Sequence, residues 1–256
     1  MLETAIEAAG EAGKLLRKNF GSVLNVNLAT HHDIKLEIDV QAQEVITRVI
    51  LADFPDHCIL GEEAVTGNPE ADVRWVVDPL DGTVNYFYGI PHYAVSIAAQ
   101  ERREGDRWET VAGVVLAPEI DELFATAKGQ LATLNGRHIH VSDRADIGQA
   151  IVVVAFFKSM RTIDQGLESF GRIIHKVRKL RLMGAAALDV AYVASGRFDA
   201  YVEYGIKLWD IAAGQFILEN AGGRVESKPL PEPHSFDVQM WNGKIPLAEL
   251  LKPTQP

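Results

Sequence analysis

Cysteine is nearly absent from this chain of 256 residues, which has a single one, Cys58. An intrachain disulfide is therefore excluded, and a reducing compartment is the simplest expectation. No apolar run approaches the roughly 18 residues that a membrane-spanning helix needs, so no membrane partner is expected. The first residues carry glutamates instead of the basic-then-apolar pattern of a signal peptide, so the expected location is the cytoplasm.

Basic residues are scarce, with 25 lysines and arginines against 35 aspartates and glutamates and a net charge of −10. An acidic surface argues against broad binding of nucleic acid or anionic membrane. A small phosphorylated substrate is compatible with this charge, because bound cations can reverse the charge of a local site. The sequence also lacks a Gly-x-Ser-x-Gly elbow, a P-loop and a close metal-ligand pattern among its eight histidines.

The first half of the chain has the pattern of two helices followed by a mostly antiparallel sheet. Apolar residues at helical spacing predict one helix over residues 2–19 and a second from Val40 to Phe54. Asp39 then lies near the first turn of the second helix, where a carboxylate suits the exposed amides. Strands are predicted at 57–60, 73–77, 93–99, 111–116, 122–127 and 131–134, with a hairpin turn at Asn135-Gly136.

Strands and helices alternate in the second half, which predicts a layered α/β arrangement. The expected strands are 151–156, 180–183 and 198–203, and the expected helices are 162–175, 185–194 and 210–220. The proline-rich segment that follows is expected to be mostly loop. Polar residues at 142–150 suggest a division into an N-terminal α+β half, 1–145, and a C-terminal α/β half, 146–256, that completes the active site.

The segment from Trp75 to Thr83 is the most informative one. A short apolar run ends in Asp78 and Asp81, and Gly82 and Thr83 follow at once. An unpartnered carboxylate at the end of a buried strand is costly, so a cation is expected there, and oxygen ligands suit Mg²⁺ or Mn²⁺. A helix that begins near Thr83 would direct free amides at the same place, where they bind phosphate well. Ordinary turn chemistry is the alternative interpretation of the Asp-Pro-x-Asp-Gly sequence.

Other carboxylates have two interpretations each. Glu62 and Glu63 follow an apolar run and Gly61, and adjacent residues of an extended chain face opposite ways. At most one of them is therefore a direct ligand, and a surface pair is the alternative. Asp210 lies in an apolar setting, where it is either a ligand or a helix N-cap.

Three segments now suggest a family: Gly61-Glu62-Glu63, the run from Trp75 to Asn85, and Leu208 to Gly214. In order and spacing they resemble the signature blocks of the inositol monophosphatase family. The similarity extends over essentially the whole chain, including Met183–Ala187 and Tyr201–Gly205. The resemblance fits an α/β fold, a layered α-β-α-β-α sandwich in which N-terminal helices and a mostly antiparallel sheet precede a smaller α/β half.

The resemblance also implies roles for particular residues. The implied metal ligands are Glu62, Asp78, the carbonyl of Leu80, Asp81 and Asp210. Thr83, paired with Asp39, would position and deprotonate the attacking water, and Glu62 would help a third, looser ion. The implied substrate contacts are Asp81, Gly82, Thr83, Gly184, Ala185, Ala186 and Glu203.

The implied activity is Mg²⁺-dependent hydrolysis of a small phosphorylated polyol such as inositol monophosphate, by a homodimer that is sensitive to lithium. About two to three Mg²⁺ ions per subunit are implied, with Mn²⁺ as a possible replacement. Leu36 stands where many relatives carry threonine, which places the third ion in question. The same chemistry on fructose-1,6-bisphosphate, histidinol phosphate, a 3′-phosphonucleotide or NADP is an alternative, and a non-catalytic regulator is another.

Overall fold

The computed structural model describes residues 1–23, 26–29, 34–105, 107–156 and 159–252. Its helices are α1 (Leu2–Asn19), α2 (Glu37–Asp53), α3 (Thr83–Phe87), α4 (Met160–Ile173), α5 (Ala186–Ala194), α6 (Leu208–Asn220) and α7 (Leu247–Leu251). Its strands are β1 (Val26–Ala29), β2 (Ile34–Leu36), β3 (Cys58–Gly61), β4 (Val65–Gly67), β5 (Val73–Asp81), β6 (Ala94–Arg103), β7 (Arg107–Ala117), β8 (Glu122–Ala127), β9 (Thr133–Leu134), β10 (Arg137–His138), β11 (Ile151–Phe156), β12 (Lys179–Arg181), β13 (Ala200–Lys207), β14 (Arg224–Pro229) and β15 (Ser235–Trp241).

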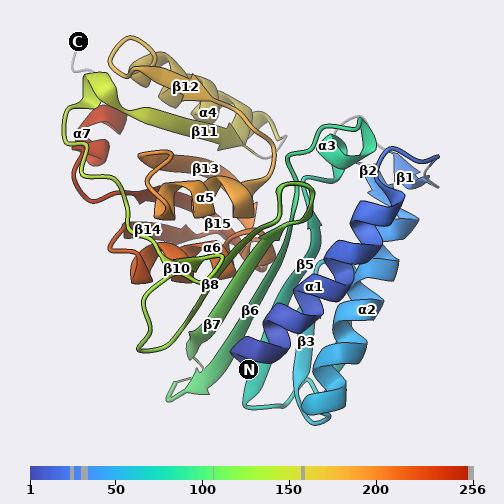
Figure 1. Cartoon of the computed structure of the whole chain (residues 1–256). Helices are drawn as coiled ribbons and strands as arrows, with labels where there is room; N and C mark the ends of the chain where they lie inside the picture. Colours follow the sequence, from blue (N-terminus) through green and yellow to red (C-terminus); the bar gives the residue numbers. More distant parts are fainter. Residues whose placement is uncertain (24–25, 30–33, 106, 157–158, 253–256) are drawn as a thin grey trace.

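These elements form the predicted α-β-α-β-α sandwich (Figure 1). Helices α1 and α2 cover one face of an eight-stranded sheet of order β10-β9-β8-β7-β6-β5-β3-β4. Helices α5 and α6 pack between that sheet and a five-stranded sheet of order β12-β11-β13-β15-β14, and α4 packs on the outer face of the second sheet beside α7. No helix within the described ranges combines the length and the hydropathy needed to cross a membrane.

The large sheet is antiparallel except where β3 and β5 run parallel, which confirms its predicted character. The predicted hairpin turn is confirmed as well, because Asn135 and Gly136 have φ values of 49° and 76° between β9 and β10. Strand β5 is longer than predicted and continues through both aspartates to Asp81. Strand β9 is shorter than predicted, with two residues.

The prediction of a mostly loop-like tail is wrong, because β14, β15 and α7 lie there. Strand β15 pairs with β13 on one side and β14 on the other, and its residues Val238 and Met240 are fully buried at alternating positions. The prolines flank these strands: Pro229 ends the edge strand β14, where a missing N–H costs little. A short strand, β1, lies between α1 and β2 and pairs with β2 in antiparallel orientation.

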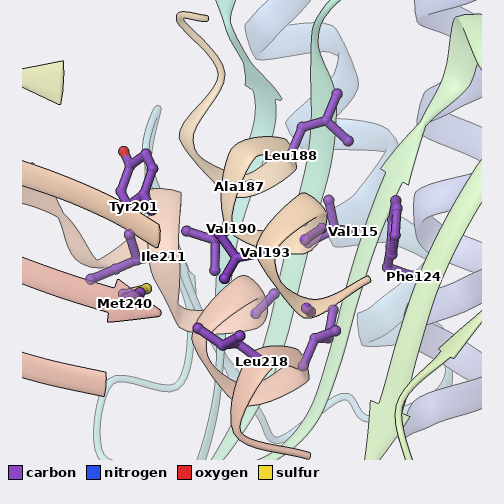
Figure 2. Close-up of a cluster of buried hydrophobic side chains, with 14 of the residues drawn as sticks. Val115, Phe124, Ala187, Leu188, Val190, Val193, Tyr201, Ile211, Leu218 and Met240 are labelled. Carbon is purple, nitrogen blue, oxygen red and sulfur yellow. The ribbon is translucent and has the colours of Figure 1, made fainter. Parts of the chain in front are cut away.

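The core between the sheets is built around α5 and α6 (Figure 2). Helix α5 is apolar nearly all round, as expected for a helix covered on both sides. Val115 and Phe124 reach this core from the large sheet, and Tyr201 and Met240 reach it from the small one. Each such side chain contributes roughly 1.5–3 kcal/mol by leaving water. The two halves of the chain therefore share one core, and the division at residues 145 and 146 stays a prediction.

Candidate metal and phosphate site

A β-bulge brings the two aspartates of β5 to one side of the large sheet. Asp78 is paired with Ser96 and Asp81 with Ala94, so three steps along β5 match two steps along β6. Without the extra residue, positions three apart would face opposite sides of the sheet. The bulge contains Pro79, which lacks the N–H that a regular ladder requires.

Three carboxylates meet beside this bulge. Glu62, Asp78 and Asp210 each offer one oxygen, and these oxygens lie within 4.8 Å of one another. Their positions in the sequence are far apart: Glu62 follows β3, Asp78 lies on β5, and Asp210 lies in the first turn of α6. The central member, Asp78, is only 1% exposed, and its Oδ1 accepts the backbone N–H of Leu80 at 3.0 Å. The convergence predicted for these three residues is therefore present.

The start of α6 is attached to the large sheet directly beside Asp78. The hydroxyl of Ser96, the strand partner of Asp78, donates to the carbonyl of Trp209 at 3.1 Å. The next residue, Asp210, accepts the backbone N–H of Lys207 with Oδ2 at 3.1 Å. The N-cap reading of Asp210 is wrong, because α6 begins at Leu208 and its N-cap is Lys207. Asp210 is the third helical residue, where its carboxylate accepts the N–H of the N-cap and also belongs to the carboxylate cluster.

Glu62 is positioned by a contact that the sequence did not reveal. The side-chain amide of Gln43, on α2, donates to the carbonyl of Ala64 at 2.9 Å and accepts the N–H of Glu63 at 2.9 Å. The amide packs so closely on Gly61 that a Cβ there would lie 2.1 Å from its oxygen. Gly61 is therefore required for close packing, and Gln43 holds the turn that presents Glu62.

Asp81 is hydrogen-bonded to the first turn of α5, and its charge also acts on Asp78 and Asp210. Its two oxygens accept the backbone N–H groups of Ala186 at 3.0 Å and Ala187 at 2.8 Å. Burial and the charge of Asp189 raise the pKa of Asp81 to about 7, while these two hydrogen bonds lower it. The role of Asp81 as a ligand to a second metal stays a prediction.

The two residues of the predicted catalytic pair lie in the first turns of two helices, α3 and α2. Helix α3 begins at Thr83, as predicted, and the Thr83 hydroxyl donates to the carbonyl of Leu80 at 3.0 Å. Asp39 is buried in the first turn of α2, where its Oδ2 accepts the N–H of Leu36 at 2.7 Å. The pairing of Thr83 with Asp39, and the Leu80 carbonyl as a metal ligand, stay predictions.

The segment before α5 packs directly against the start of α3. Gly82 has a φ of 89°, and a Cβ on it would lie 3.1 Å from atoms of both Gly184 and Ala185. The side-chain amide of Asn85 donates to the carbonyl of Met183 at 2.9 Å. A larger residue at position 82 would therefore separate the predicted phosphate-binding turn from the predicted substrate-binding segment.

A second group of acids, buried or half-buried, lies around Asp81. Glu203, on β13, accepts a hydrogen bond from the Tyr201 hydroxyl, and burial raises its pKa to about 8. Asp189, on α5, is 1% exposed and lies 3.0 Å from Nε2 of His92, and burial raises its pKa to about 6. Sequence reasoning missed Asp189, although a carboxylate within the apolar run 186–194 was an available signal.

The electrostatics of the cluster suit a divalent cation. Burial, followed by the charge of Glu62, raises the pKa of Asp78 and of Asp210 well above the ordinary range. Neighbouring anions of this kind favour either protonation or a bound cation. All donors are oxygen, the ligand type that Mg²⁺ and Mn²⁺ prefer, so the residues fit the implied metal.

Known proteins resemble this chain over most of its length. A sequence profile described as the inositol monophosphatase family matches residues 1–233. A fructose-1,6-bisphosphatase/inositol-1-monophosphatase from Aquifex aeolicus is 40% identical over 225 residues, 87% of this chain and 83% of the relative. The Nus factor SuhB of Pasteurella multocida is 39% identical over 230 residues, 88% of this chain and 84% of the relative. The crystal structure of the extragenic suppressor protein SuhB from Bartonella henselae has a TM-score of 0.88 at 31% identity, covering 99% of this chain and 98% of its own.

Proposed function

The chain belongs to the inositol monophosphatase family, and on that premise we propose that it is a metal-dependent hydrolase of phosphate monoesters. The observation that carries the proposal is the approach of Glu62, Asp78 and Asp210, whose oxygens lie within 4.8 Å of one another. Three buried or half-buried acids gathered this closely destabilise the fold in their charged form unless a cation joins them. A purely structural or binding protein has no need of such a cluster.

We propose that Glu62, Asp78 and Asp210 hold Mg²⁺, with Asp81 and the Leu80 carbonyl completing a set of about two to three ions. When bound, Mg²⁺ neutralises charge on the phosphoryl oxygens and makes water more acidic. Asp78 is suited to the central position because it is the most buried of the three carboxylates. The backbone N–H of Leu80 holds its carboxylate, and its strand partner Ser96 is bonded to the start of α6.

The proton and phosphate chemistry is assigned to residues around the start of α3. We propose that Asp39 receives the proton of the attacking water through the hydroxyl of Thr83. Both groups are fixed by hydrogen bonds of 3.0 Å or shorter to backbone atoms, which favours a defined orientation. The amides of Gly82 and Thr83 are the proposed contacts of the phosphate.

The leaving alcohol is assigned to the second group of acids. Glu203 and Asp81 would accept hydrogen bonds from hydroxyl groups, and Gly184, Ala185 and Ala186 would border the same pocket. A carboxylate beside vicinal hydroxyls favours a polyol such as inositol monophosphate. The name of the Aquifex aeolicus relative supports fructose-1,6-bisphosphate equally, and histidinol phosphate, 3′-phosphonucleotides and NADP share the same chemistry.

A second candidate function rests on the Pasteurella multocida relative, which is named a Nus factor. This second candidate is the non-catalytic regulator named above as an alternative. Such a regulator would have a nucleic-acid-associated partner, against which the net charge of −10 argues. The cytoplasmic location and the homodimer stay predictions.

The deciding experiment measures phosphate release from a panel of phosphate monoesters assayed side by side. The panel contains inositol 1-phosphate, fructose-1,6-bisphosphate, histidinol phosphate, a 3′-phosphonucleotide and NADP. Each is tested with Mg²⁺, with Mn²⁺, with EDTA and with Mg²⁺ plus Li⁺. We expect Mg²⁺-dependent, Li⁺-sensitive turnover of at least one substrate. The Asp78→Asn variant serves as the control and should be inactive. Absence of turnover at every metal concentration would favour the regulator.

A further inference from the structure

A cleft of about 640 Å³ lies on the face of the large sheet that carries α6. Arg74, Gln100 and Thr110 form its floor, on three adjacent strands in register. Leu208 and Phe216 of α6 line one wall, and Phe236 of β15 lines another. Its volume is within the range of sites that bind small molecules. Apolar side chains of α6 and β15 and several polar side chains line it together.

Arg74 is the unusual group in this cleft. Its Nε donates to Oε1 of Gln100 at 2.9 Å, and its guanidinium lies 4.2 Å from the centre of the Trp108 ring. Arg102 lies 5.1 Å from the centre of the same ring, so a second positive charge is nearby. Across the part of the chain that the structure describes, no carboxylate pairs with Arg74. Burial lowers the pKa of Arg74 to about 10, which reflects this lack of a compensating anion.

Two carboxylates line the same cleft but are engaged elsewhere. Glu109 lies 2.6 Å from Nε of Arg103 and 2.8 Å from Nζ of Lys128. Glu219 is exposed and accepts the side-chain amide of Gln215 at 3.2 Å. The positive charge of Arg74 is therefore available to a molecule that enters from solvent.

We propose that this cleft binds a small organic anion with an apolar, flat body. The two terminal nitrogens of the Arg74 guanidinium would pair with a carboxylate or phosphate, for which their planar fork is suited. The body of the ligand would pack against Leu208, Phe216 and Phe236. Arg74 and Asp78 lie four residues apart on β5, about 13 Å at 3.3 Å per residue, so the anion-binding end of the cleft lies away from Asp78. The other end approaches the cluster, because Leu208 lines the cleft two residues before Asp210.

The test uses the full chain with 5-fluorotryptophan in place of its four tryptophans, kept free of metal with EDTA. Naphthalene-2-carboxylate and naphthalene-2-phosphonate are titrated separately, to distinguish the two anionic groups, and neutral 2-naphthamide is the matched control. We expect a saturable shift of the Trp108 fluorine resonance with at least one anion, and at least about tenfold weaker binding of the amide. Absence of a saturable shift with both anions, or equal binding of the amide, overturns the proposal.

Variants assign the binding to the cleft. Arg74→Met should weaken binding at least about tenfold, and Arg137→Met, at an exposed position on β10, should leave it unchanged. Gln215→Trp keeps Arg74 but fills the cleft, and it should also abolish binding. Asp78→Asn should bind the anion as the wild type does. Binding in the cleft can therefore be confirmed or rejected independently of the proposed phosphatase activity. Unchanged binding in folded Arg74→Met or in Gln215→Trp contradicts the proposal.

Discussion

Asp81 and Ala187 are joined by a hydrogen bond of 2.8 Å between carboxylate and backbone amide, across 106 residues of chain. The bond places the N-terminus of α5 against the end of β5, and a negative charge at that position is favourable. One side chain therefore links the large sheet to the central helix layer. A substitution of Asp81 should therefore affect both the site and this link between the layers.

We expect Asp81→Asn to lower the turnover number at least about 100-fold while the protein stays folded. Asparagine keeps one acceptor oxygen, but its NH₂ group would face one of the two amides that Asp81 now accepts. Steady-state phosphate release measures the turnover number, and a thermal melt shows whether the variant is folded. Asp143→Asn, at an exposed position, is the control and should leave both unchanged. Near-normal turnover of Asp81→Asn would reject its proposed role.

Asp78→Asn should separate metal binding from folding. The substitution removes one of three neighbouring charges but keeps Oδ1, which accepts the N–H of Leu80. The metal-free variant should therefore melt about 2–4 °C higher than the metal-free wild type at pH 8, the shift that about 1 kcal/mol gives in a domain of this size. The rise in melting temperature caused by Mg²⁺ should be lost. A variant that retains this rise shows that Asp78 does not hold the metal.

The stability of the metal-free protein should fall as pH rises from 5 to 8.5. Burial raises the pKa of Asp81 to about 7 and of Glu203 to about 8, and it raises those of Asp78 and Asp210 as well. A carboxyl group whose pKa is raised by folding stabilises the native state at low pH and loses that contribution as pH passes through the raised value.

Mg²⁺ replaces the lost protons, so its stabilising effect should be larger at pH 8 than at pH 5.5, by on the order of 5 °C in melting temperature. Differential scanning calorimetry at both pH values checks this, with Na⁺ at equal ionic strength as the control. An effect of Mg²⁺ that is equal at both pH values, or larger at pH 5.5, contradicts the assignment of these acids to a metal site.

Gly61→Ala should disturb the turn that presents Glu62. The added Cβ would lie 2.1 Å from Oε1 of Gln43, so the Gln43 amide would leave its two hydrogen bonds. We expect a loss of about 1–3 kcal/mol in unfolding free energy, together with weaker Mg²⁺ binding measured by calorimetry. Gly10→Ala is the matched control, because a Cβ there meets no atom within 4 Å and should stabilise α1 by about 0.5–1 kcal/mol. Unchanged Mg²⁺ affinity in Gly61→Ala would exclude a positioning role for the Gln43 contact.

Much of the candidate site could be predicted from the sequence, because its acids follow apolar strands or open helices. The apolar run 75–77 marks Asp78, and the apolar residues around Asp210 mark the start of α6. The bulge in β5 could not be predicted, since the extra residue becomes apparent only when β5 is aligned with β6. Gln43 was equally hidden, because a glutamine within an amphipathic helix looks like any other polar residue until its partners across the fold are known.

The fold was predicted best where periodicity is strong and worst where prolines are frequent. Helix α1 and strands β8 and β11 have the predicted bounds. The tail was misread because prolines were taken as signs of loop, whereas β15 derives its stability from strand neighbours on both sides. Tertiary pairing of this kind outweighs local propensity and is not visible in a single sequence.

The position of α5 and α6 between the two sheets has a consequence for synthesis on the ribosome. The large sheet is complete once residue 138 has been made, but one of its faces is covered only after α6 ends at Asn220. At about 5–20 residues per second, the nascent chain exposes Val115, Phe124 and their neighbours for roughly 4–16 s. During that interval the unfinished protein presents a broad apolar surface, which is prone to aggregation until α5 and α6 cover it.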